Sequence, residues 1–495
     1  MKKHFLSIAV VLTMLSCSNN ETIEIDEQQE LLTKKEINSI INNSLQSSGD
    51  FKWTDQQDHT IWSAVKHGEG ILTIGYGTSK SNFARSAEAN NIKNELIQLV
   101  HTLEKTSAKG KTELYVDENI NTIDIKVTNK ETITALLQDS RVRYIEPSGY
   151  SFIKTDNSAR SDSFDSLSSG CGFREDVIDN SDYRSIAPGA IVPWAFDLHN
   201  IPQAWEHSTG NNVTIAIIDT GMSPEQLYMN QKFNNGFSNG RTIQKKGTFV
   251  DSFWFWSTQV DGPNDSCGHG TRMAAVATAP RNNANLPVGV AYNANLVSYR
   301  AVENVVIDTY HEQKGVANAL IDAANNSNVD IISISLGNPF YIGRVADAIK
   351  YAHSKGKLIF AAGGTSTVLT TWYGVIFPAN MNEVVAVTGV KEGVYDNCNV
   401  CHDGSQIEFT IQMQRTNGTE NKIPVLSYYN DKARYEGGSS IATATTAGIA
   451  ALVWSKNPSW SREQVIQKMR ESSEFYPNKD SKYGYGNIDA LKAVQ

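Results

Sequence analysis

The sequence lacks an excess of positive charge, long apolar runs and internal repeats. Its 495 residues carry a formal net charge of -9, so no basic surface is available to neutralise phosphates, which argues against a nucleic-acid partner. Beyond the N-terminus, no stretch is apolar for the roughly 20 residues that a membrane-spanning helix needs. The length predicts two or three domains, and the 35 glycines favour a loop-rich α/β architecture over a helical bundle.

Metal-binding motifs are also missing. None of the ten histidines lies in a His-Glu-x-x-His helix, which argues against a metallohydrolase. No second Cys/His pair stands at zinc-ligand spacing, and no acidic loop matches the EF-hand pattern. We therefore assign no metal site, and activity that survives a zinc chelator would exclude the metallohydrolase.

Cysteine is scarce, with only five residues in the chain. Cys17 lies beside the N-terminal apolar run. The other four are Cys171, Cys267, Cys398 and Cys401. In an oxidising compartment these four allow three disulfide pairings, and the sequence does not choose among them. Residues 398–402 also match the Cys-x-x-Cys-His haem motif, but a local disulfide or two free thiols is the better interpretation, because short motifs match by accident.

The N-terminus has the features of an export signal. Two lysines are followed by an apolar run over residues 5–15 that is too short to span a bilayer. Cys17 follows this run, and the segment resembles the lipid-modified end of bacterial lipoprotein signals, although Met14 stands where leucine is usual. We expect residues 1–17 to be a signal peptide and Cys17 to carry lipid. The protein would then be exported, either as a membrane-anchored lipoprotein or in secreted or periplasmic form.

Three stretches precede residue 191. Residues 18–68 are polar and are predicted to form a spacer with a short helix over residues 31–45. Residues 69–150 show the order strand, helix, strand, strand, helix, strand, which is the ferredoxin-like split βαβ arrangement. Residues 151–190 are rich in serine and aspartate, so we expect an exposed, cleavable linker. The strands are predicted over residues 71–76, 114–116, 120–127 and 142–145, and the helices over 86–104 and 131–138.

Residues 191–495 are predicted to form a doubly wound α/β domain with a mostly parallel sheet. Helical patterns, including residues 315–326 and 342–354, alternate with short apolar runs. Because these runs are almost continuously apolar, both faces of each strand are expected to be buried, as in parallel sheets. The runs cover residues 213–218, 296–299, 329–334, 358–361 and 384–387.

Three short motifs in this domain can carry chemistry. Asp219 directly follows a buried strand, at the sheet edge where active groups gather. His269 opens a small-residue helix, whose dipole favours the neutral imidazole that a general base needs. Ser440 opens another such helix, where its own N–H can help to bind an oxyanion. Each motif alone is weak, since a turn aspartate, a surface histidine and a serine cap are all common.

Together these motifs resemble the signatures of subtilisin-like serine proteases (subtilases, the peptidase S8 family), in the subtilisin order Asp, His, Ser. The resemblance runs from about Trp194 to the C-terminus. Residues 71–147 resemble the family's inhibitory propeptide. The resemblance thus implies a subtilisin-like domain, a self-inhibited zymogen and cleavage between about Pro147 and Trp194. Further segments similar to the family are residues 332–337, 360–363 and 483–490.

The resemblance also implies roles for individual residues. Ser440 would attack the scissile carbonyl, and His269 would take its proton and return it to the leaving amine. Asp219 would orient His269 and stabilise the imidazolium. These roles would make the protein a serine-type endopeptidase.

Partners follow from the same resemblance. Ser335, Leu336 and Gly337 would hold an extended peptide by backbone hydrogen bonds, as an added strand, so the substrate is a protein or peptide. The protein's own propeptide is a second partner. No cofactor is required for the chemistry; structural calcium is common in the family, but the sequence assigns no site for it.

Gly364 is the main departure from the family pattern, which places asparagine there to donate to the oxyanion. Losing one such donor lowers turnover by about 10²–10³-fold. Backbone N–H groups near Gly364 or the Thr365 hydroxyl could replace the amide, or another side chain could reach in. Arg272 is a smaller departure. The alternative function is a catalytically weak or inactive subtilisin-fold protein that binds peptides, which a serine-directed covalent probe would distinguish.

Overall fold

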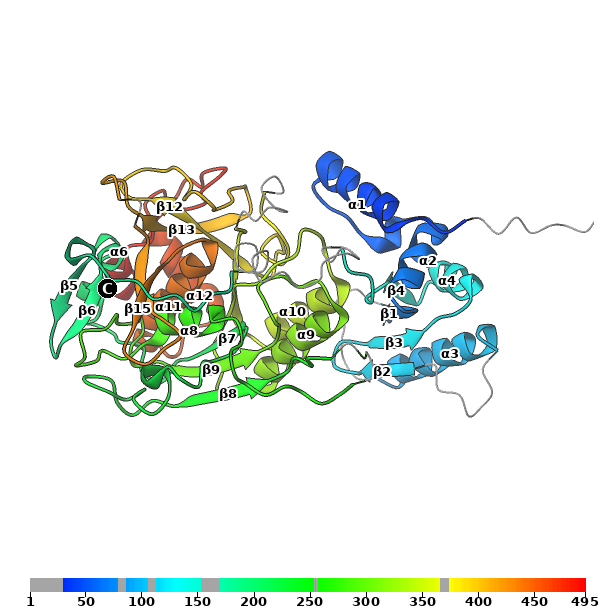
Figure 1. Ribbon diagram of the computed structural model, residues 1–495, viewed down its shortest axis with the longest axis horizontal. Coiled ribbons are helices and arrows are strands. Elements are labelled where there is room, and N and C mark those ends of the chain that lie inside the picture. Colours follow the sequence, from blue (N-terminus) through cyan, green and yellow to red (C-terminus); the bar gives the residue numbers. More distant parts are fainter. Residues whose placement is uncertain are drawn as a thin grey trace, which may run out of the picture. The chain divides into compact units, whose positions relative to one another are not determined.

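The structure is a computed structural model that describes residues 30–78, 86–105, 113–152, 170–252, 254, 257–365, 374–419 and 421–495. The predicted signal segment 1–17, with Cys17, lies outside these residues. No helix among them combines the length and apolarity that crossing a membrane requires. Two sheets dominate the described chain, one of four strands and one of seven (Figure 1).

The N-terminal domain, residues 32–152, is built on the four-stranded sheet. Its strands are antiparallel and lie in the order β2-β3-β1-β4. This order, with one helix after β1 and one after β3, is the predicted ferredoxin-like arrangement. The elements are α1 (Lys34–Ser48), η1 (Trp53–Asp55), α2 (Asp58–His67), β1 (Ile71–Tyr76), α3 (Ala87–Leu103), β2 (Glu113–Asp117), β3 (Thr122–Lys126), α4 (Lys130–Gln138) and β4 (Val142–Glu146).

Helix α1 matches the short helix predicted over residues 31–45, but α1 and α2 belong to the N-terminal domain instead of a polar spacer over residues 18–68. Ile37, Ile41 and Leu45 recur at helical spacing, and all three are buried in the same core as the sheet. Thr33 caps α1 in a capping box with Glu36. The polar residues between these positions dilute the apolar stripe, and the chain belongs to the N-terminal domain from residue 32 onward.

The predicted linker over residues 151–190 differs from the structure in its second half. Strand β5 (Tyr183–Ile186) pairs antiparallel with β6 (Ala190–Pro193). The Asp176 N–H donates to the carbonyl oxygen of Ala433 over 3.0 Å. Residues 170–190 are mostly exposed, but they pair with one another and with β15 (Ala433–Glu436) instead of forming a free linker, and residues 153–169 lie outside the described residues.

The C-terminal domain is doubly wound, as predicted. Its seven strands lie in the order β13-β12-β11-β10-β7-β9-β8, and neighbouring strands are parallel throughout. The strands are β7 (Thr214–Asp219), β8 (Ile243–Gly247), β9 (Asn295–Arg300), β10 (Ile331–Ile334), β11 (Leu358–Ala362), β12 (Val385–Lys391) and β13 (Ile407–Gln414). The main helices are α8 (His269–Thr278), α9 (Tyr310–Asn325), α10 (Gly343–Ser354), α11 (Ser439–Lys456) and α12 (Arg462–Glu471). The smaller elements are η2 (Asn180–Asp182), α6 (Trp194–Leu198), α7 (Ile201–Ala204), η3 (Leu227–Met229), β14 (Ile423–Leu426), β15 (Ala433–Glu436) and α13 (Ala490–Val494).

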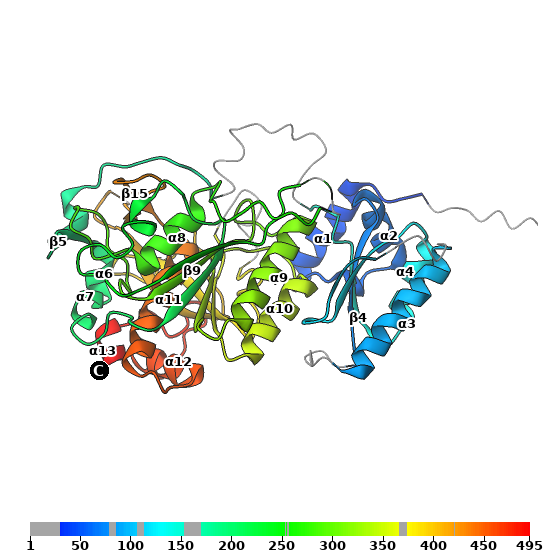
Figure 2. The same ribbon diagram turned by 90° about the horizontal axis from the view of Figure 1, so that it is seen from below.

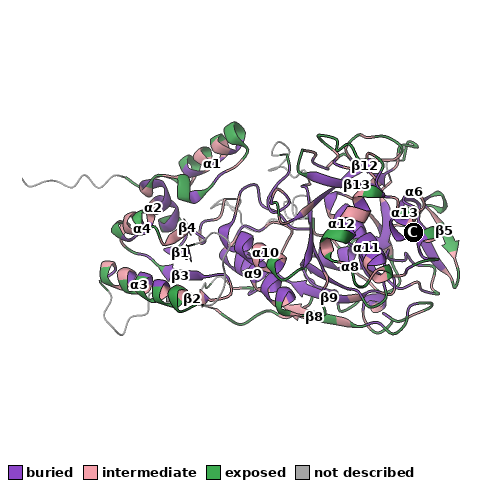
Figure 3. Ribbon diagram, turned by 180° about the vertical axis from the view of Figure 1, so that it is seen from behind, coloured by how far each residue is buried: buried purple, intermediate pink, exposed green. Residues whose placement is uncertain are grey.

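Strand β7 shows why this sheet needs apolar residues on both faces. Ile215 and Ile217 lie in one core with residues of α8 and α11. Ala216 and Ile218 lie in a second core with residues of α9 and α10. Figure 2 shows the two helix pairs on opposite sides of the sheet, and Figure 3 shows that its strands are mostly buried.

The carboxyl ends of the parallel strands bring the candidate residues to one edge. Strand β7 ends at Asp219, Ser335 follows β10, and Gly364 follows β11. Helix α8 begins at His269 and α11 begins at Ser439. In doubly wound sheets this edge is where ligands bind.

Candidate active site

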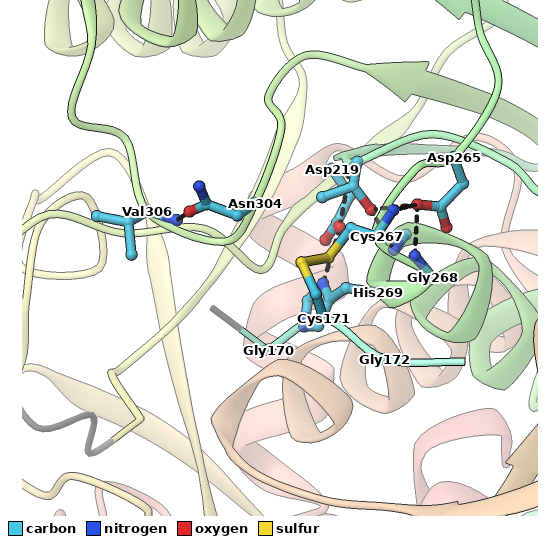
Figure 4. Close-up of a disulfide and its surroundings, with 12 residues drawn as sticks. Gly170, Cys171, Gly172, Asp219, Asp265, Cys267, Gly268, His269, Asn304 and Val306 are labelled. Atoms are coloured by element: carbon cyan, nitrogen blue, oxygen red, sulfur yellow. Dashed lines mark hydrogen bonds and ion pairs between the residues drawn. A yellow bond between two sulfur atoms is a disulfide. The ribbon is translucent and has the colours of Figure 1, made fainter. Parts of the chain in front are cut away.

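Asp219 and His269 form a hydrogen-bonded pair (Figure 4). The His269 Nδ1–H donates to Asp219 Oδ1 over 2.7 Å, and both side chains are buried. Asp219 Oδ1 also accepts the N–H of Thr220. Because the Nδ1 proton faces the carboxylate, the neutral ring presents Nε2 as a proton acceptor, which is the tautomer that a general base needs.

Asp265, which the sequence analysis did not single out, fixes the start of α8. Its Oδ1 accepts the N–H groups of Cys267 and Gly268, and its Oδ2 accepts the N–H and the hydroxyl of Thr271. A carboxylate that binds the free N–H groups of a first turn stabilises the helix start. Asp265 Oδ1 also accepts the hydroxyl of Thr220, which ties β7 to α8. An aspartate shortly before a predicted helix was the available sequence signal.

Two glycines let these segments approach closely. A Cβ on Gly270 would lie 2.5 Å from the carbonyl oxygen of Gly221. The Gly270 N–H donates to Thr220 Oγ1 over 2.8 Å. Gly221 and Gly270 thus let the ends of β7 and α8 approach closely enough for Asp219 and His269 to form a hydrogen bond.

Ser440 lies in the first turn of α11. The preceding Gly438 has a φ of +90°, a conformation that favours glycine. The Ser335 hydroxyl donates to the carbonyl oxygen of Ser440 over 3.1 Å. The described residues contain no hydrogen bond between the Ser440 hydroxyl and the His269 ring. Such bonds are often long in a free enzyme and tighten with substrate, so this geometry is compatible with their pairing.

The predicted substrate-binding residues Ser335, Leu336 and Gly337 follow β10. The Gly337 N–H donates to the carbonyl oxygen of Val305 over 3.1 Å, and the Gly337 carbonyl accepts the N–H of Ile307 over 3.0 Å. Gly337 is therefore not free to pair with an added strand in this structure. Leu336 is buried, so its side chain belongs to the core.

The two candidate oxyanion residues are both engaged. The Gly364 N–H donates to Ser439 Oγ over 3.2 Å. The hydroxyls of Thr365 and Ser439 share a hydrogen bond of 3.0 Å. Gly364 also contacts His402, a residue to which the sequence analysis gave no role in the site.

Residues 170–172 lie beside His269, and a disulfide attaches this segment to the turn that precedes α8 (Figure 4). Cys171 forms a disulfide with Cys267, two residues before His269. A Cβ on Gly170 would lie 3.4 Å from Cδ2 of the His269 ring. This segment therefore borders the imidazole, although the sequence predicted it to be linker.

Arg272 connects this segment to the third motif. Its guanidinium donates to the carbonyl oxygens of Gly170 and Gly172 over 2.7 and 2.9 Å. Its Nε lies 2.6 Å from Glu436, and Arg434 lies 3.3 Å from the same carboxylate oxygen. Burial opposes ionisation of Glu436, but the two guanidiniums hold its pKa below the usual value. This buried charge cluster explains the departure from the family at Arg272.

Comparison with known proteins identifies the family of this chain. The model of the family described as "Peptidase_S8: Subtilase family" matches residues 210–486. The chain belongs to the subtilase family. The thermostable alkaline protease of Halalkalibacterium halodurans is 28% identical over 305 residues, which cover 61% of this chain and 74% of that protein. Subtilisin E of Bacillus subtilis is 27% identical over 289 residues, which cover 58% of this chain and 67% of that protein.

A solved serine protease structure has a similar fold over most of this chain. The epidermin leader peptide processing serine protease of Staphylococcus aureus aligns with a TM-score of 0.58 at 18% identity, over 86% of this chain and 97% of that chain. At this identity the likeness concerns the fold alone. The family and its curated protease relatives make this subtilase a serine-type endopeptidase, which confirms the resemblance found in three short motifs.

Proposed function

We propose that this subtilase is an exported endopeptidase that cuts protein chains through Asp219, His269 and Ser440. The hydrogen bond between Asp219 and His269 at the start of α8 is the observation that carries the proposal. Ser440 supports it from the first turn of α11, where the helix N-terminus favours the negative charge of an oxyanion.

In the proposed reaction, Nε2 of His269 removes the hydroxyl proton of Ser440 as the oxygen attacks the scissile carbonyl. The Nδ1 proton stays on the ring, and the Asp219 carboxylate stabilises the imidazolium. The Nε2 proton is then given to the leaving amine, and a water molecule releases the acyl group by the same sequence. These steps need no cofactor, and calcium, if bound, would be structural.

We propose further that the N-terminal domain is an inhibitory propeptide. It contacts α9 and α10 through buried polar groups. The Gly343 N–H, at the start of α10, donates to Glu146 Oε1 over 2.7 Å. Asp124 forms a buried ion pair with Arg344, the residue that follows Gly343 on α10. A domain that supplies a hydrogen-bond acceptor to a free N–H at a helix N-terminus of the peptidase domain stabilises that helix while it stays bound.

Burial dominates the electrostatics of this contact. Arg143 lies 2.7 Å from Asp347, and both side chains are buried. Burial raises the pKa of Asp347, and it raises the pKa of Glu146 to about 8 although backbone N–H groups oppose the shift. Glu146 is therefore protonated at neutral pH while the domains are associated.

A fluorophosphonate probe, which reacts with activated serines, tests the proposed function. Processed wild type should be labelled, and Ser440→Ala should not be. Ser455→Ala is the matched control on the same helix, where the hydroxyl donates to the carbonyl oxygen of Asn211. Unlabelled processed wild type would instead favour the peptide-binding alternative. If Ser440→Ala were processed as fast as wild type, self-cleavage would be wrong.

We propose that residues 1–17 direct export and that Cys17 carries lipid. The support is the sequence pattern of a charged start, a short apolar run and a following cysteine. Cells grown with labelled palmitate should yield labelled wild type and unlabelled Cys17→Ser. A Cys17→Ser variant that stays labelled and membrane-bound would contradict the lipid anchor.

A further inference from the structure

The imidazole of His402 stands against Gly364, where the family's asparagine is missing. A Cβ on Gly364 would lie 2.4 Å from His402 Nδ1 and 3.0 Å from its Cγ. Gly364 also has a φ of +132°, a conformation that residues with a side chain rarely adopt. An asparagine at this position and His402 in its present place exclude each other, so the glycine and the histidine belong together.

The backbone holds His402 firmly in this place. Its N–H donates to the carbonyl oxygen of Gly364 over 3.0 Å, and the Thr388 hydroxyl donates to its carbonyl oxygen over 2.5 Å. A disulfide between Cys398 and Cys401 closes the turn directly before it. This is the local disulfide that the sequence left as one alternative. The Cys-x-x-Cys-His motif thus sets the position of an imidazole.

One nitrogen of this ring is unused. The Nδ1–H donates to the carbonyl oxygen of Gly374 over 2.7 Å, and because a carbonyl only accepts, the Nδ1 proton is fixed. In the described part of the chain, Nε2 is buried and has no hydrogen-bond partner. His402 as a whole is only 6% exposed. A buried polar atom without a partner costs about 1–3 kcal/mol, so its presence calls for an explanation.

The groups that could otherwise replace the asparagine already have hydrogen-bond partners. The N–H of Gly364 is bound to Ser439, and so is the Thr365 hydroxyl. Ser439 directly precedes Ser440, so these groups lie next to the serine that would form the oxyanion. The three atoms nearest to a Cβ on Gly364 all belong to His402, whose Nε2 has no hydrogen-bond partner among the described residues.

We propose that His402 is a catalytic residue whose imidazolium Nε2–H donates to the oxyanion formed when Ser440 attacks the substrate carbonyl. The inference rests on the proposed role of Ser440. In the resting enzyme Nε2 carries a lone pair. The ring takes up one proton from solvent at Nε2 as the carbonyl oxygen becomes negative, and it returns that proton when the oxyanion collapses. No covalent bond to His402 forms or breaks.

The surroundings of His402 make this contribution depend on pH. Burial lowers the pKa of His402, while the bond to Gly374 and the charge of Asp403 oppose the shift. Asp403 is the charged group that faces the ring among the described residues; it accepts a hydrogen bond from Asn397 and lies 3.7 Å from Lys482. The neighbouring segments contribute Thr388 of β12 and the disulfide between Cys398 and Cys401. Neither group titrates. The imidazolium therefore forms more easily as the pH falls.

The test compares kcat of processed wild type, His402→Phe and His402→Gln between about pH 5.5 and 8.5 on one peptide substrate. The ratio of kcat between two of these enzymes cancels every contribution that they share, so it isolates the effect of residue 402. We expect the wild type to His402→Phe ratio to rise by up to about tenfold per pH unit as the pH falls, and to reach about 10²-fold. The glutamine amide can donate a hydrogen bond without first taking up a proton. The kcat of His402→Gln should therefore exceed that of His402→Phe by a factor that does not depend on pH. His353→Gln, whose histidine also has a pKa lowered by burial, should behave as wild type.

A wild type to His402→Phe ratio that does not change with pH would overturn the proposal and leave His402 a packing residue. If His402→Phe does not fold, His402→Gln decides: a pH profile identical to wild type would overturn it. If the proposed endopeptidase function itself were wrong, processed wild type would remain unlabelled by the fluorophosphonate probe at every pH. That result differs from the one that would overturn the role of His402 alone.

Discussion

Glu146→Gln should remove a pH dependence from the association of the N-terminal domain. Glutamine keeps a carbonyl oxygen for the Gly343 N–H but cannot ionise. Burial raises the pKa of Glu146 from 4.5 to about 8 in the associated state. Association therefore takes up a proton, so it is strongest below pH 4.5 and weakens as the pH rises toward about 8.

The magnitude follows from the size of this shift. Between pH 4.5 and about 8, each pH unit weakens the association free energy of the N-terminal domain by about 1.4 kcal/mol, which is tenfold in the association constant. At pH 7 the association is therefore about 3 kcal/mol weaker than below pH 4.5. Burial raises the pKa of Asp347 too, which acts in the same direction. Burial lowers the pKa of Lys314 to about 8, but below that pH Lys314 is charged in both states and adds no pH dependence.

Hydrogen exchange on the intact Ser440→Ala chain measures this association. The protection factors of the Gly343 and Arg344 amides, corrected for intrinsic exchange, should fall by about tenfold per pH unit between about pH 5 and 8. Adding Glu146→Gln should flatten the curve, whereas Glu131→Gln, at an exposed position on α4, should not. Parallel curves with and without Glu146→Gln would refute the reasoning.

Three further predictions concern single contacts. Asp219→Asn should lower kcat by about 10³–10⁴-fold with an unchanged thermal unfolding curve, because an amide favours the wrong His269 tautomer; a loss below about tenfold would contradict that role. Asp124→Ala leaves Arg344 buried without its carboxylate and should weaken the contact between the domains by about 3–5 kcal/mol, measured as earlier domain separation in urea; an unchanged midpoint would count against it. Cys171→Ser together with Cys267→Ser removes a link between residues 96 positions apart and should lower the free energy of unfolding by about 2–4 kcal/mol in urea titrations; equal stability would show that the link constrains little.

Local signals made much of the fold predictable. The apolar run before Asp219 identifies β7, because a strand buried on both faces needs apolar residues at every position. The motifs around His269 and Ser440 identify helix starts through glycines that no other residue could replace at those φ values or distances. Where one short segment determines the structure, the sequence is sufficient.

Long-range contacts were not predictable in the same way. Ile37, Ile41 and Leu45 form a core stripe only because a distant sheet covers them. The pairing of Cys171 with Cys267 depends on chain segments that meet in space, so the sequence left it open. His402 lies 38 positions beyond Gly364, and its contact with that glycine appears only after both have been placed by the sheet.

The disulfide between Cys171 and Cys267 separates cutting the chain from releasing a fragment. A peptide bond broken before Cys171 frees everything on its N-terminal side. One broken between the two cysteines yields two polypeptides that remain joined through sulfur and separate only after a thiol is added. Maturation by the second route would need two chemically different events, hydrolysis and reduction. The redox state of the compartment would then decide whether the N-terminal domain can leave.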